Sequence, residues 1–532
     1  MSKPRFSSRV TALISRFLHD KNANIAVIFT IALLPILTGI GCAVDYSLAS
    51  RMKAKLQSAA DAASVASISQ NSAGYNAATT MTSDGSIAAG VTEANNIFDG
   101  NISGITGYTN LSRTSTVTKT GVKLASSVQF SADVPTVFLK VIGYQKLTVT
   151  GNSGSGASLP PYLDFYLMLD VSASMGLPST DAEQTRLAAV NPDDFSIYPN
   201  GCTFACHFQT KNACVDPSVG QVAKPPPGPV NSAYPTNNYC LGYAISRVSQ
   251  SGYKNLLQTT SNYPMKKQQL PPAMVSGLSA TLTPGVQNSL ITGNANSLPN
   301  SLTPVTSCPT DGTDACIQLR ADAVGYALTQ LFQTAKDDEK VTNQFRIGLY
   351  PFIRYLYEYV KLTSSFDPSQ TNTPGTINYA AANLATLLDT GNNSNLGSGG
   401  THFENAFQNM NNLIPSVGGG TSSTNRQPYV FLVTDGAQNF QTQWSGNWAG
   451  SNGATVMPAA STGKSYCKPL KDRGIIISVL YIPYQPIQNP THVFNNEDYV
   501  ANANIPNIPP SLQDCASPSS TRRTRRTTSR RR

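Results

Sequence analysis

An uninterrupted apolar stretch near the start of the chain limits what this protein can be. Residues 25–44 read IAVIFTIALLPILTGIGCAV and contain no charged side chain. As a helix they would span about 30 Å, the thickness of the hydrocarbon core of a bilayer. Five basic residues precede this stretch, and only one acidic residue, Asp20, lies among them. The positive-inside rule therefore predicts a cytoplasmic basic segment over residues 1–23, a transmembrane helix over residues 24–44 and an extracytoplasmic remainder.

A cleaved signal peptide is the alternative interpretation of this segment. The apolar stretch is longer than the core of a typical signal peptide, which has about 7–15 residues. No clean small-x-small cleavage site precedes a mature start in this part of the chain. The sequence therefore favours an uncleaved anchor that attaches the protein to the membrane through one helix.

The charge distribution argues against a nucleic-acid partner. The formal net charge is +9, but seven arginines lie in the last eleven residues, 522–532. Subtracting seven from +9 leaves +2 for the rest of the chain. The basic character belongs to the two ends, and residues 511–532 are expected to form an Arg-rich tail. Eight of the nine cysteines follow the apolar stretch, which predicts disulfides in an oxidising compartment.

The region between the span and the main domain changes character twice. Val44, Leu48, Met52, Leu56 and Ala59/Ala60 recur at helical spacing through an alanine-rich stretch, so the helix is expected to continue beyond the span to about Ile68. Residues 45–113 are therefore predicted to be helical at first and then a Ser-, Gly- and Asn-rich extension, with residues 69–113 forming loop or weak helix.

A short alternating segment follows this extension. Apolar and polar residues alternate over residues 114–150, which predicts a small β-rich module. Residues 151–161 read GNSGSGASLPP, a composition typical of a flexible linker. The linker is predicted to separate the β-rich module from the main domain.

The N-terminal segment resembles a known family. The matching features are Asn24-Ile25-Ala26 at the start of the span, Val44-Asp45-Tyr46 at its end, and Leu56-Gln57 followed by Ala-Asp-Ala-Ala at residues 60–63. These features are similar to those of TadE/TadG-like proteins of the Flp, or tight-adherence, pilus assembly system. The resemblance implies a single-pass protein of the bacterial inner membrane that works with pilus assembly components.

Hydroxyl and carboxylate side chains follow the first apolar segment of the main domain. Residues 162–170 read YLDFYLMLD, a run typical of a buried strand, and end at Asp170. Ser172 and Ser174 complete a D-x-S-x-S spacing, in which alternate side chains at a strand end can converge on one point. One carboxylate and two hydroxyls are hard oxygen ligands, suited to Mg²⁺ rather than zinc.

Two later loops add further oxygen ligands. Thr401 follows two glycines and precedes a segment with apolar residues at helical spacing, so its hydroxyl lies at a predicted helix start. Asp435 ends a second apolar run, YVFLVTD, at residues 429–435. Further strands are predicted at residues 345–352 and 475–482. In α/β sheets such side chains gather at the carboxyl ends of strands, so these loops are expected to meet.

This constellation resembles the metal-ion-dependent adhesion site (MIDAS) of the von Willebrand A (vWA) family. Asp170, Ser172 and Ser174 match the first loop of the site, Thr401 matches the second and Asp435 the third. The resemblance implies an α/β fold with a Rossmann-like, doubly wound and mostly parallel sheet. It also implies Mg²⁺ or Mn²⁺ held directly by the two serines, with the other ligands direct or through water. An open coordination position would accept a carboxylate from a protein partner.

The limits of the main domain follow from this resemblance. The vWA domain is predicted over residues 162–510, with a Cys-containing insertion over residues 177–314. TadG-like proteins join such a domain to the same type of anchor, so the two resemblances agree. The alternative is a vWA fold whose serines and aspartates only cap helices and turns and hold no metal.

The remaining motifs do not indicate an enzyme. Cys202 and Cys206 precede His207, but this spacing is one residue too long for haem attachment, and disulfides are favoured over zinc outside the cytoplasm. Residues 463–465 read GKS, but the first glycine of a phosphate loop is missing because position 458 is Pro. No nucleophile, base and acid form a recognisable set.

The sequence therefore predicts a non-enzymatic, membrane-anchored vWA protein that acts in adhesion or Flp-type pilus assembly. Its binding would depend on a metal ion and a protein carboxylate. The alternative is a structural, minor-pilin-like envelope component with a metal-free vWA domain.

Overall fold

The computed structural model divides the chain into two compact units. We call residues 1–160 with 340–342 the N-terminal unit, and residues 161–339 with 343–532 the C-terminal unit. The structure describes residues 15, 23–190, 215–216, 221–222, 246–252, 305–366, 369, 373–388, 395–397, 400–444, 447–458, 465–484, 486 and 497–518.

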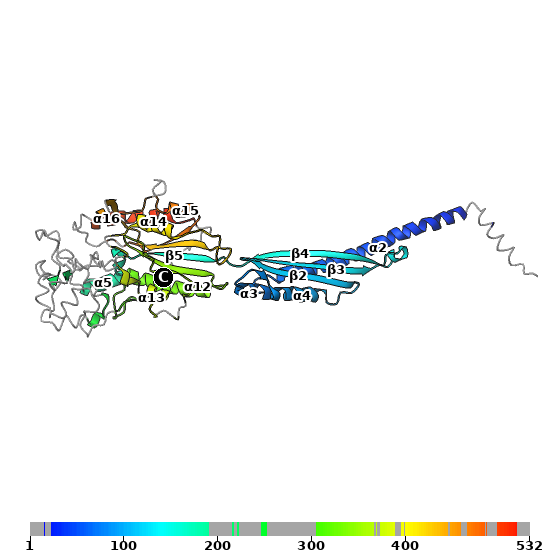
Figure 1. Ribbon diagram of the computed structural model, residues 1–532, viewed down its shortest axis with the longest axis horizontal. Coiled ribbons are helices and arrows are strands. Elements are labelled where there is room, and N and C mark those ends of the chain that lie inside the picture. Colours follow the sequence, from blue (N-terminus) through cyan, green and yellow to red (C-terminus); the bar gives the residue numbers. More distant parts are fainter. Residues whose placement is uncertain are drawn as a thin grey trace, which may run out of the picture. The chain divides into compact units, whose positions relative to one another are not determined.

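The N-terminal unit combines one long helix with an antiparallel sheet (Figure 1). Its sheet has the order β1-β2-β3-β4, and every pair of neighbours is antiparallel. The helices are α2 (Ala23–Ala66), α3 (Ala73–Thr80) and α4 (Ala88–Ile102). The strands are β1 (Gly85–Ser86), β2 (Thr109–Thr120), β3 (Lys123–Pro135) and β4 (Lys146–Ser158), with the 3₁₀ helix η1 (Leu139–Ile142) between β3 and β4.

Helix α2 has two parts with opposite surroundings. Its 44 residues run without a break through Pro35. Apolar side chains of its N-terminal part, including Ile28 and Ile31, are more than 60% exposed. Among the described residues, it is the one helix long and apolar enough to cross a membrane. The C-terminal part is amphipathic and buries its apolar face against α4, β3 and β4.

The predicted continuation of this helix is present, and its predicted apolar face is buried from Met52 onward but not at Val44 and Leu48. Val44 and Leu48 are each 40% exposed, whereas Ala49, Met52 and Leu56 are buried. The buried side chains that continue this face are those of Ala59, Ala60 and Ala63. Small residues on this face let the helix approach the sheet closely.

The glycine-rich segment predicted as a linker over residues 151–161 is instead mostly strand, because β4 extends to Ser158. Two of its small residues face α2. A Cβ atom on Gly151 would overlap Gln57 Oε1 of α2, and the Ser153 hydroxyl lies 3.0 Å from that of Ser64. The change between the two units falls between residues 160 and 161. A composition that resembles a linker therefore serves close helix–sheet packing here.

The extension predicted as loop or weak helix over residues 69–113 is also more regular than expected. It contains helices α3 and α4, and β2 starts at Thr109, before the predicted module. Helix α4 buries Ala94 and Phe98 against α2, and this contact stabilises a helix whose apolar pattern is short.

The C-terminal unit is built on a mixed five-stranded sheet of order β13-β10-β5-β8-β9. Neighbours among the first four strands are parallel, and β9 is antiparallel to β8. These strands are β5 (Leu163–Asp170), β8 (Phe345–Phe352), β9 (Val360–Thr363), β10 (Gln427–Thr434) and β13 (Ile476–Tyr481). From β5 the chain adds β8 and β9 on one side and later β10 and β13 on the other.

Helices cover both faces of this sheet (Figure 1). Tyr166 and Met168 of β5 point into one core, while Leu167 and Leu169 point into the other. One core contains α14 (Phe403–Leu413), α15 (Lys468–Asp472), α16 (Glu497–Asn504) and α17 (Ile508–Cys515). The other contains α12 (Arg320–Asp337), α13 (Ile377–Ala382) and the 3₁₀ helix η5 (Leu384–Leu387). The arrangement is a three-layer, doubly wound α/β unit.

Short elements complete the described part of this unit. They are the 3₁₀ helices η2 (Ala173–Gly176) and η7 (Ile505–Asn507), helix α5 (Asp181–Val190), and strands β6 (Val215–Asp216), β7 (Gln221–Val222), β11 (Gln438–Trp444) and β12 (Asn447–Thr455). The predicted tail starts later than residue 511, because α17 extends to Cys515, and residues 519–532 lie outside the description.

Two disulfides confirm the prediction of oxidised cysteines. Cys308 pairs with Cys316, and Cys467 pairs with Cys515. Most of the predicted insertion, including Cys202, Cys206, His207, Cys214 and Cys240, lies outside the described residues.

Candidate metal site

The first loop of the predicted site follows the central strand directly. Asp170 is the last residue of β5, and its side chain is buried. Its Oδ1 accepts a hydrogen bond from the backbone N–H of Ser172 at 3.0 Å. The 3₁₀ helix η2 then turns the chain, so that the Oγ atoms of Ser172 and Ser174 lie 3.2 Å apart. The D-x-S-x-S spacing therefore brings two hydroxyls together beside one buried carboxylate.

The third loop joins the first through an unpredicted threonine. Thr434 ends β10, the strand that pairs with β5, and its hydroxyl donates to Asp170 Oδ2 at 2.6 Å. The Thr434 hydroxyl oxygen also accepts the N–H of Gly436 at 2.9 Å, which fixes the turn around Asp435. Asp435 is fully buried. The two aspartates thus lie at the carboxyl ends of adjacent parallel strands, where the sheet changes winding direction and α/β proteins commonly bind ligands.

The second loop is held beside the first by the end of β8. The N–H of Val171 bonds to the carbonyl of Phe352 at 3.2 Å, and the N–H of His402 bonds to the next carbonyl, that of Ile353, at 2.9 Å. Thr401, 3% exposed, is thereby fixed near the first loop. No described hydrogen bond links its hydroxyl to the other four predicted ligands. The position of Thr401 is therefore fixed through the backbone of its loop.

A second unpredicted residue, Asn439, fixes Thr401 from the side of the third loop. Its Oδ1 accepts the N–H of Thr401 at 3.2 Å, and its own N–H donates to the Thr401 carbonyl at 3.1 Å. Gly400 precedes this contact with φ +106°, and a Cβ atom there would lie 2.3 Å from Asn439 Cγ. The glycine before Thr401 is therefore required for both its backbone angle and this close approach.

Burial makes the two carboxylates costly to charge. Burial and the neighbouring Asp435 carboxylate raise the pKa of Asp170 to about 7. Burial also raises the pKa of Asp435, although the guanidinium of Arg320 opposes this effect. Arg320 Nη1 lies 3.3 Å from Asp435 Oδ2, and both side chains are at most 3% exposed. One buried arginine thus pairs with one of two neighbouring buried carboxylates, that of Asp435.

One atom of this cluster lacks a protein partner. Asp435 Oδ1 is buried and accepts no hydrogen bond from any described residue. The Ser174 hydroxyl and the N–H of Ala437 both lie close enough to lower the pKa of Asp435, but neither forms a hydrogen bond of normal geometry with this atom. Buried carboxylate oxygens are rarely left unpartnered, because the lost hydration is not replaced. The residues fit a hard divalent cation, which would supply the missing partner and the missing positive charge.

The structure therefore brings Asp170, Ser172, Ser174 and Asp435 together, with Thr401 held on the neighbouring loop. Sequence reasoning missed Thr434, Asn439 and Arg320. The first two lie within a few residues of Asp435 at the end of strand β10, so their position was a usable signal. Arg320 lies 115 residues before Asp435 and had no local signal.

Comparison with known proteins supports the N-terminal resemblance. A family model described as "Putative Flp pilus-assembly TadE/G-like" matches residues 23–70, which form the whole of α2 and the turn after it. No curated protein sequence is significantly similar to this chain. A solved structure, the pilus adhesin SpaC from Lactobacillus rhamnosus GG, aligns with 12% identity and a TM-score of 0.19. It covers 76% of this chain, which spans 34% of that protein, and so low a score does not establish a common fold.

Proposed function

We propose that this chain is a membrane-anchored, non-enzymatic vWA protein that acts in adhesion or in Flp-type pilus or surface-structure assembly. Its C-terminal unit would bind Mg²⁺ or Mn²⁺ and, through the metal, a carboxylate of a protein partner. The TadE/G-like match over residues 23–70 supports the pilus setting. The unpartnered Asp435 Oδ1, beside Asp170 and Ser174 where the sheet changes winding direction, is the observation that supports metal binding most strongly.

Each site residue has a role in this proposal. The Ser172 and Ser174 hydroxyls would contact the metal directly, since they lie on one side of the cluster, 3.2 Å apart. Asp170 is oriented by Ser172 and Thr434, and it would share with Asp435 the negative charge that offsets the cation. Thr401 would complete the site from the second loop. A metal held by neutral hydroxyls remains electrophilic, and it would therefore attract a carboxylate from a partner.

The anchor sets the proposed location. Helix α2 would cross the bacterial inner membrane once, with residues 1–23 in the cytoplasm and the chain beyond residue 44 in the periplasm or further outside. The two disulfides support an oxidising compartment for the C-terminal unit. Pilus assembly components are the proposed partners.

A structural, minor-pilin-like role with a metal-free vWA domain is the second candidate. The buried Arg320–Asp435 ion pair favours it, because a guanidinium already compensates one carboxylate without a metal. A long helix lying along an antiparallel sheet also suits a packing subunit.

Calorimetric titration of Mn²⁺ and Mg²⁺ into the detergent-solubilised full-length chain separates the two candidates. We expect saturable binding that disappears in an Asp170→Ala, Ser172→Ala double variant. Ser423→Ala is the matched control, because this exposed serine precedes β10 at the opposite end of the strand from Asp435. A folded wild-type protein that binds neither cation would exclude the metal-dependent role and favour the structural one.

The partner claim needs its own measurement. Membranes that contain the full-length chain can be cross-linked in Mg²⁺ or in EDTA, followed by identification of the attached proteins. We expect pilus components to be captured in Mg²⁺ and lost both in EDTA and in Ser172→Ala. Capture that is equal under all three conditions would show that partner binding does not use the metal.

A further inference from the structure

A cluster of exposed apolar residues lies at the tip of the β3–β4 hairpin. We call residues 136–145 the η1 loop, since η1 lies within it. Five large apolar or aromatic side chains of this loop are between 46% and 82% exposed: Val137, Phe138, Val141, Ile142 and Tyr144. An exposed apolar cluster of this kind normally marks a surface that contacts a partner or a membrane.

The η1 loop is fixed to α2 at the end of the apolar span. Asp45 is the first charged residue after residues 25–44, and its buried carboxylate accepts three backbone hydrogen bonds from the loop. The donors are the N–H groups of Val137, Phe138 and Leu139, at 2.9, 2.9 and 2.7 Å. One turn earlier on α2, a Cβ atom on Gly41 would lie 2.5 Å from Phe138 Cβ. The loop therefore lies against the helix at the level where the proposed span ends.

In the described part of the N-terminal unit, large exposed apolar side chains gather on the η1 loop and on the part of α2 beside it. Among its described residues, every large exposed apolar side chain except Val65 lies on the η1 loop or on residues 28–48 of α2. The loop thus continues the apolar surface of the span and forms no separate patch. A bilayer that surrounds the span would meet the loop at its boundary.

The polar residues of the loop suit a lipid headgroup region. The loop contains no acidic residue, and its cation is Lys140; the next lysine, Lys146, pairs with Asp133. Tyr144 on the loop and Tyr46 on α2 are 63% and 72% exposed. Tyrosine is enriched at the membrane–water interface, and lysine is attracted to anionic phospholipids while its stem lies along apolar surface.

We propose that the η1 loop is a second membrane-contact element that inserts its five apolar side chains into the outer part of the leaflet from which α2 emerges. The inference rests on the proposed membrane anchoring of α2. The loop would enter by about 5–10 Å, the depth of interfacial apolar groups. A single helix can rotate and tilt freely in a bilayer, and a second contact fixed by Asp45 would set both for the N-terminal unit.

Depth-dependent fluorescence quenching tests this proposal on the full-length chain. The protein is reconstituted into phosphatidylcholine–phosphatidylglycerol vesicles with or without chain-brominated lipid, and a tryptophan is placed at one position at a time. The wild-type signal of the two native tryptophans is subtracted. Val141→Trp probes the most exposed loop residue, and Val65→Trp is the matched control, exposed to 58% on α2. Val65 lies 20 residues beyond Asp45, or about 30 Å along a helix.

We expect bromine to quench the added tryptophan of Val141→Trp at least about threefold more than that of Val65→Trp, because only the loop would reach the acyl chains. Ile36→Trp, within the span, separates the two levels of the argument. Quenching in Ile36→Trp with none in Val141→Trp would overturn the loop contact and leave the anchor intact. Absence of quenching in both variants would overturn the anchor, and the loop contact with it. An emission from Val141→Trp that is blue-shifted yet unquenched would show that protein, not lipid, covers the loop, and would also overturn the proposal.

Discussion

The two units of this chain fill their interiors with different chemistry. In the N-terminal unit, small residues bring helices and strands close together. The hydroxyls of Ser67 and Ser126 lie 2.9 Å apart between α2 and β3, and a Cβ atom on Gly74 would lie 2.8 Å from Gly90 Cα and 2.1 Å from a backbone oxygen. Added bulk is what this interior cannot accept.

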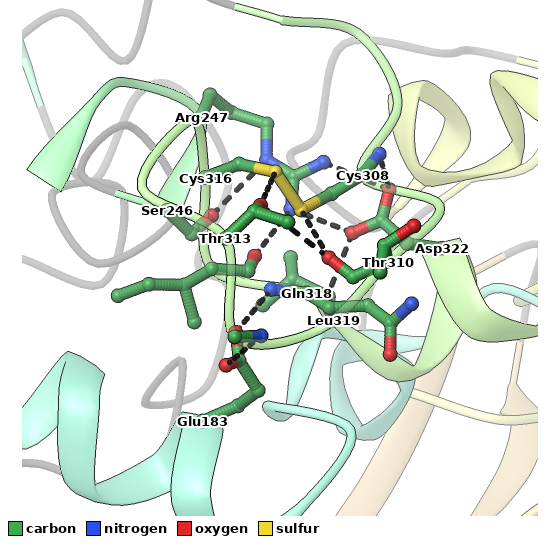
Figure 2. Close-up of a disulfide and its surroundings, with 12 residues drawn as sticks. Glu183, Ser246, Arg247, Cys308, Thr310, Thr313, Cys316, Gln318, Leu319 and Asp322 are labelled. Atoms are coloured by element: carbon green, nitrogen blue, oxygen red, sulfur yellow. Dashed lines mark hydrogen bonds and ion pairs between the residues drawn. A yellow bond between two sulfur atoms is a disulfide. The ribbon is translucent and has the colours of Figure 1, made fainter.

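The C-terminal unit instead buries pairs of oppositely charged side chains. Arg247 forms two hydrogen bonds with Asp322, at 2.9 and 2.6 Å, beside the Cys308–Cys316 disulfide (Figure 2). Asp322 also accepts the N–H groups of Cys308 and Leu319, which fixes the start of α12. Arg320, the first residue of that helix, pairs with Asp435 of the proposed metal site. The start of α12 therefore connects the buried ion pair beside the disulfide with the buried ion pair at Asp435.

This difference predicts that each unit is sensitive to a different kind of substitution. The two native tryptophans, Trp444 and Trp448, both lie in the C-terminal unit. Tryptophan fluorescence therefore reports unfolding of the C-terminal unit alone, whereas circular dichroism reports both units. The pair of signals makes the comparison measurable on the intact chain.

Removing Arg247 should have the largest effect. Arg247→Met leaves the carboxylate of Asp322 buried without its cation, and we expect the C-terminal unit to lose about 3–5 kcal/mol of unfolding free energy. The fluorescence transition in denaturant should shift strongly, and the transition of the N-terminal unit should not. Lys336→Met is the matched control, since its ion pair with Glu339 is half exposed and is expected to contribute less than about 1 kcal/mol. Equal shifts for both variants would show that burial of the pair is unimportant.

Adding one methyl group should have the next largest effect, and in the other unit. Gly74→Ala forces a Cβ atom into backbone atoms of Ser67 and Gly90, so we expect a loss of about 1–3 kcal/mol in the N-terminal unit. Gly100→Ala in α4 is the control, because nothing lies within 4 Å of its Cβ position and alanine favours helix by about 1 kcal/mol. The two variants should shift the N-terminal transition in opposite directions. Similar shifts would mean that helix propensity alone, and not close packing, decides the outcome.

The same contrast explains what sequence reasoning could predict. The C-terminal strands are continuous apolar runs, and the predicted segments 162–170, 345–352, 429–435 and 475–482 coincide with β5, β8, β10 and β13 within two residues. Their order and polar ends were enough to bring the five site residues to one edge. The N-terminal unit gave weaker signals, because its buried face consists of Ala, Ser and Gly, residues also typical of loops and linkers.

The rest could not be predicted, because it depends on contacts distant in sequence. Thr434 orients Asp170 across 264 residues, and Arg320 meets Asp435 across 115. A single sequence does not specify such pairs until strand order is known. The η1 loop likewise looks like an ordinary hairpin connection until Asp45 is seen to bind its backbone.

Replacing Arg320 should sharpen the comparison at the metal site. Arg320→Met removes a positive charge that competes with a bound cation for Asp435, so we expect the Kd for Mn²⁺ to fall about tenfold, or roughly 1.4 kcal/mol. The variant should also be less stable in EDTA, because the buried carboxylate of Asp435 loses its cation. Titration calorimetry and melting with and without Mn²⁺ measure both effects. An unchanged or weaker Mn²⁺ affinity would show that Arg320 does not oppose the metal, whereas loss of all binding would give it a structural role.

The smallest expected effect is a pH dependence in the N-terminal unit that comes from the ionised side chain of Asp133. Asp133 accepts hydrogen bonds from Lys146 at 2.5 Å, Thr148 at 2.7 Å and Asn110 at 3.0 Å. These bonds, with that from Lys146 the most important, lower the pKa of Asp133 to about 2, below the value of about 3.9 for an unfolded chain. The folded state therefore binds this proton less readily, so the stabilisation is complete above about pH 4 and disappears as the pH falls through about 2.

In Asp133→Asn, the stability of the N-terminal unit should therefore fall less steeply at acid pH. The pH dependence of the C-terminal unit, followed by tryptophan fluorescence, should not change. Melting curves between about pH 2 and 6, followed by circular dichroism and by fluorescence, give both profiles from one sample. Parallel wild-type and variant profiles would show that acid sensitivity of this unit comes from other carboxylates. A weaker pH dependence in the variant would show that Asp133 causes the acid sensitivity of the N-terminal unit. This residue lies at the end of β3, within ten residues of the loop proposed to contact the membrane.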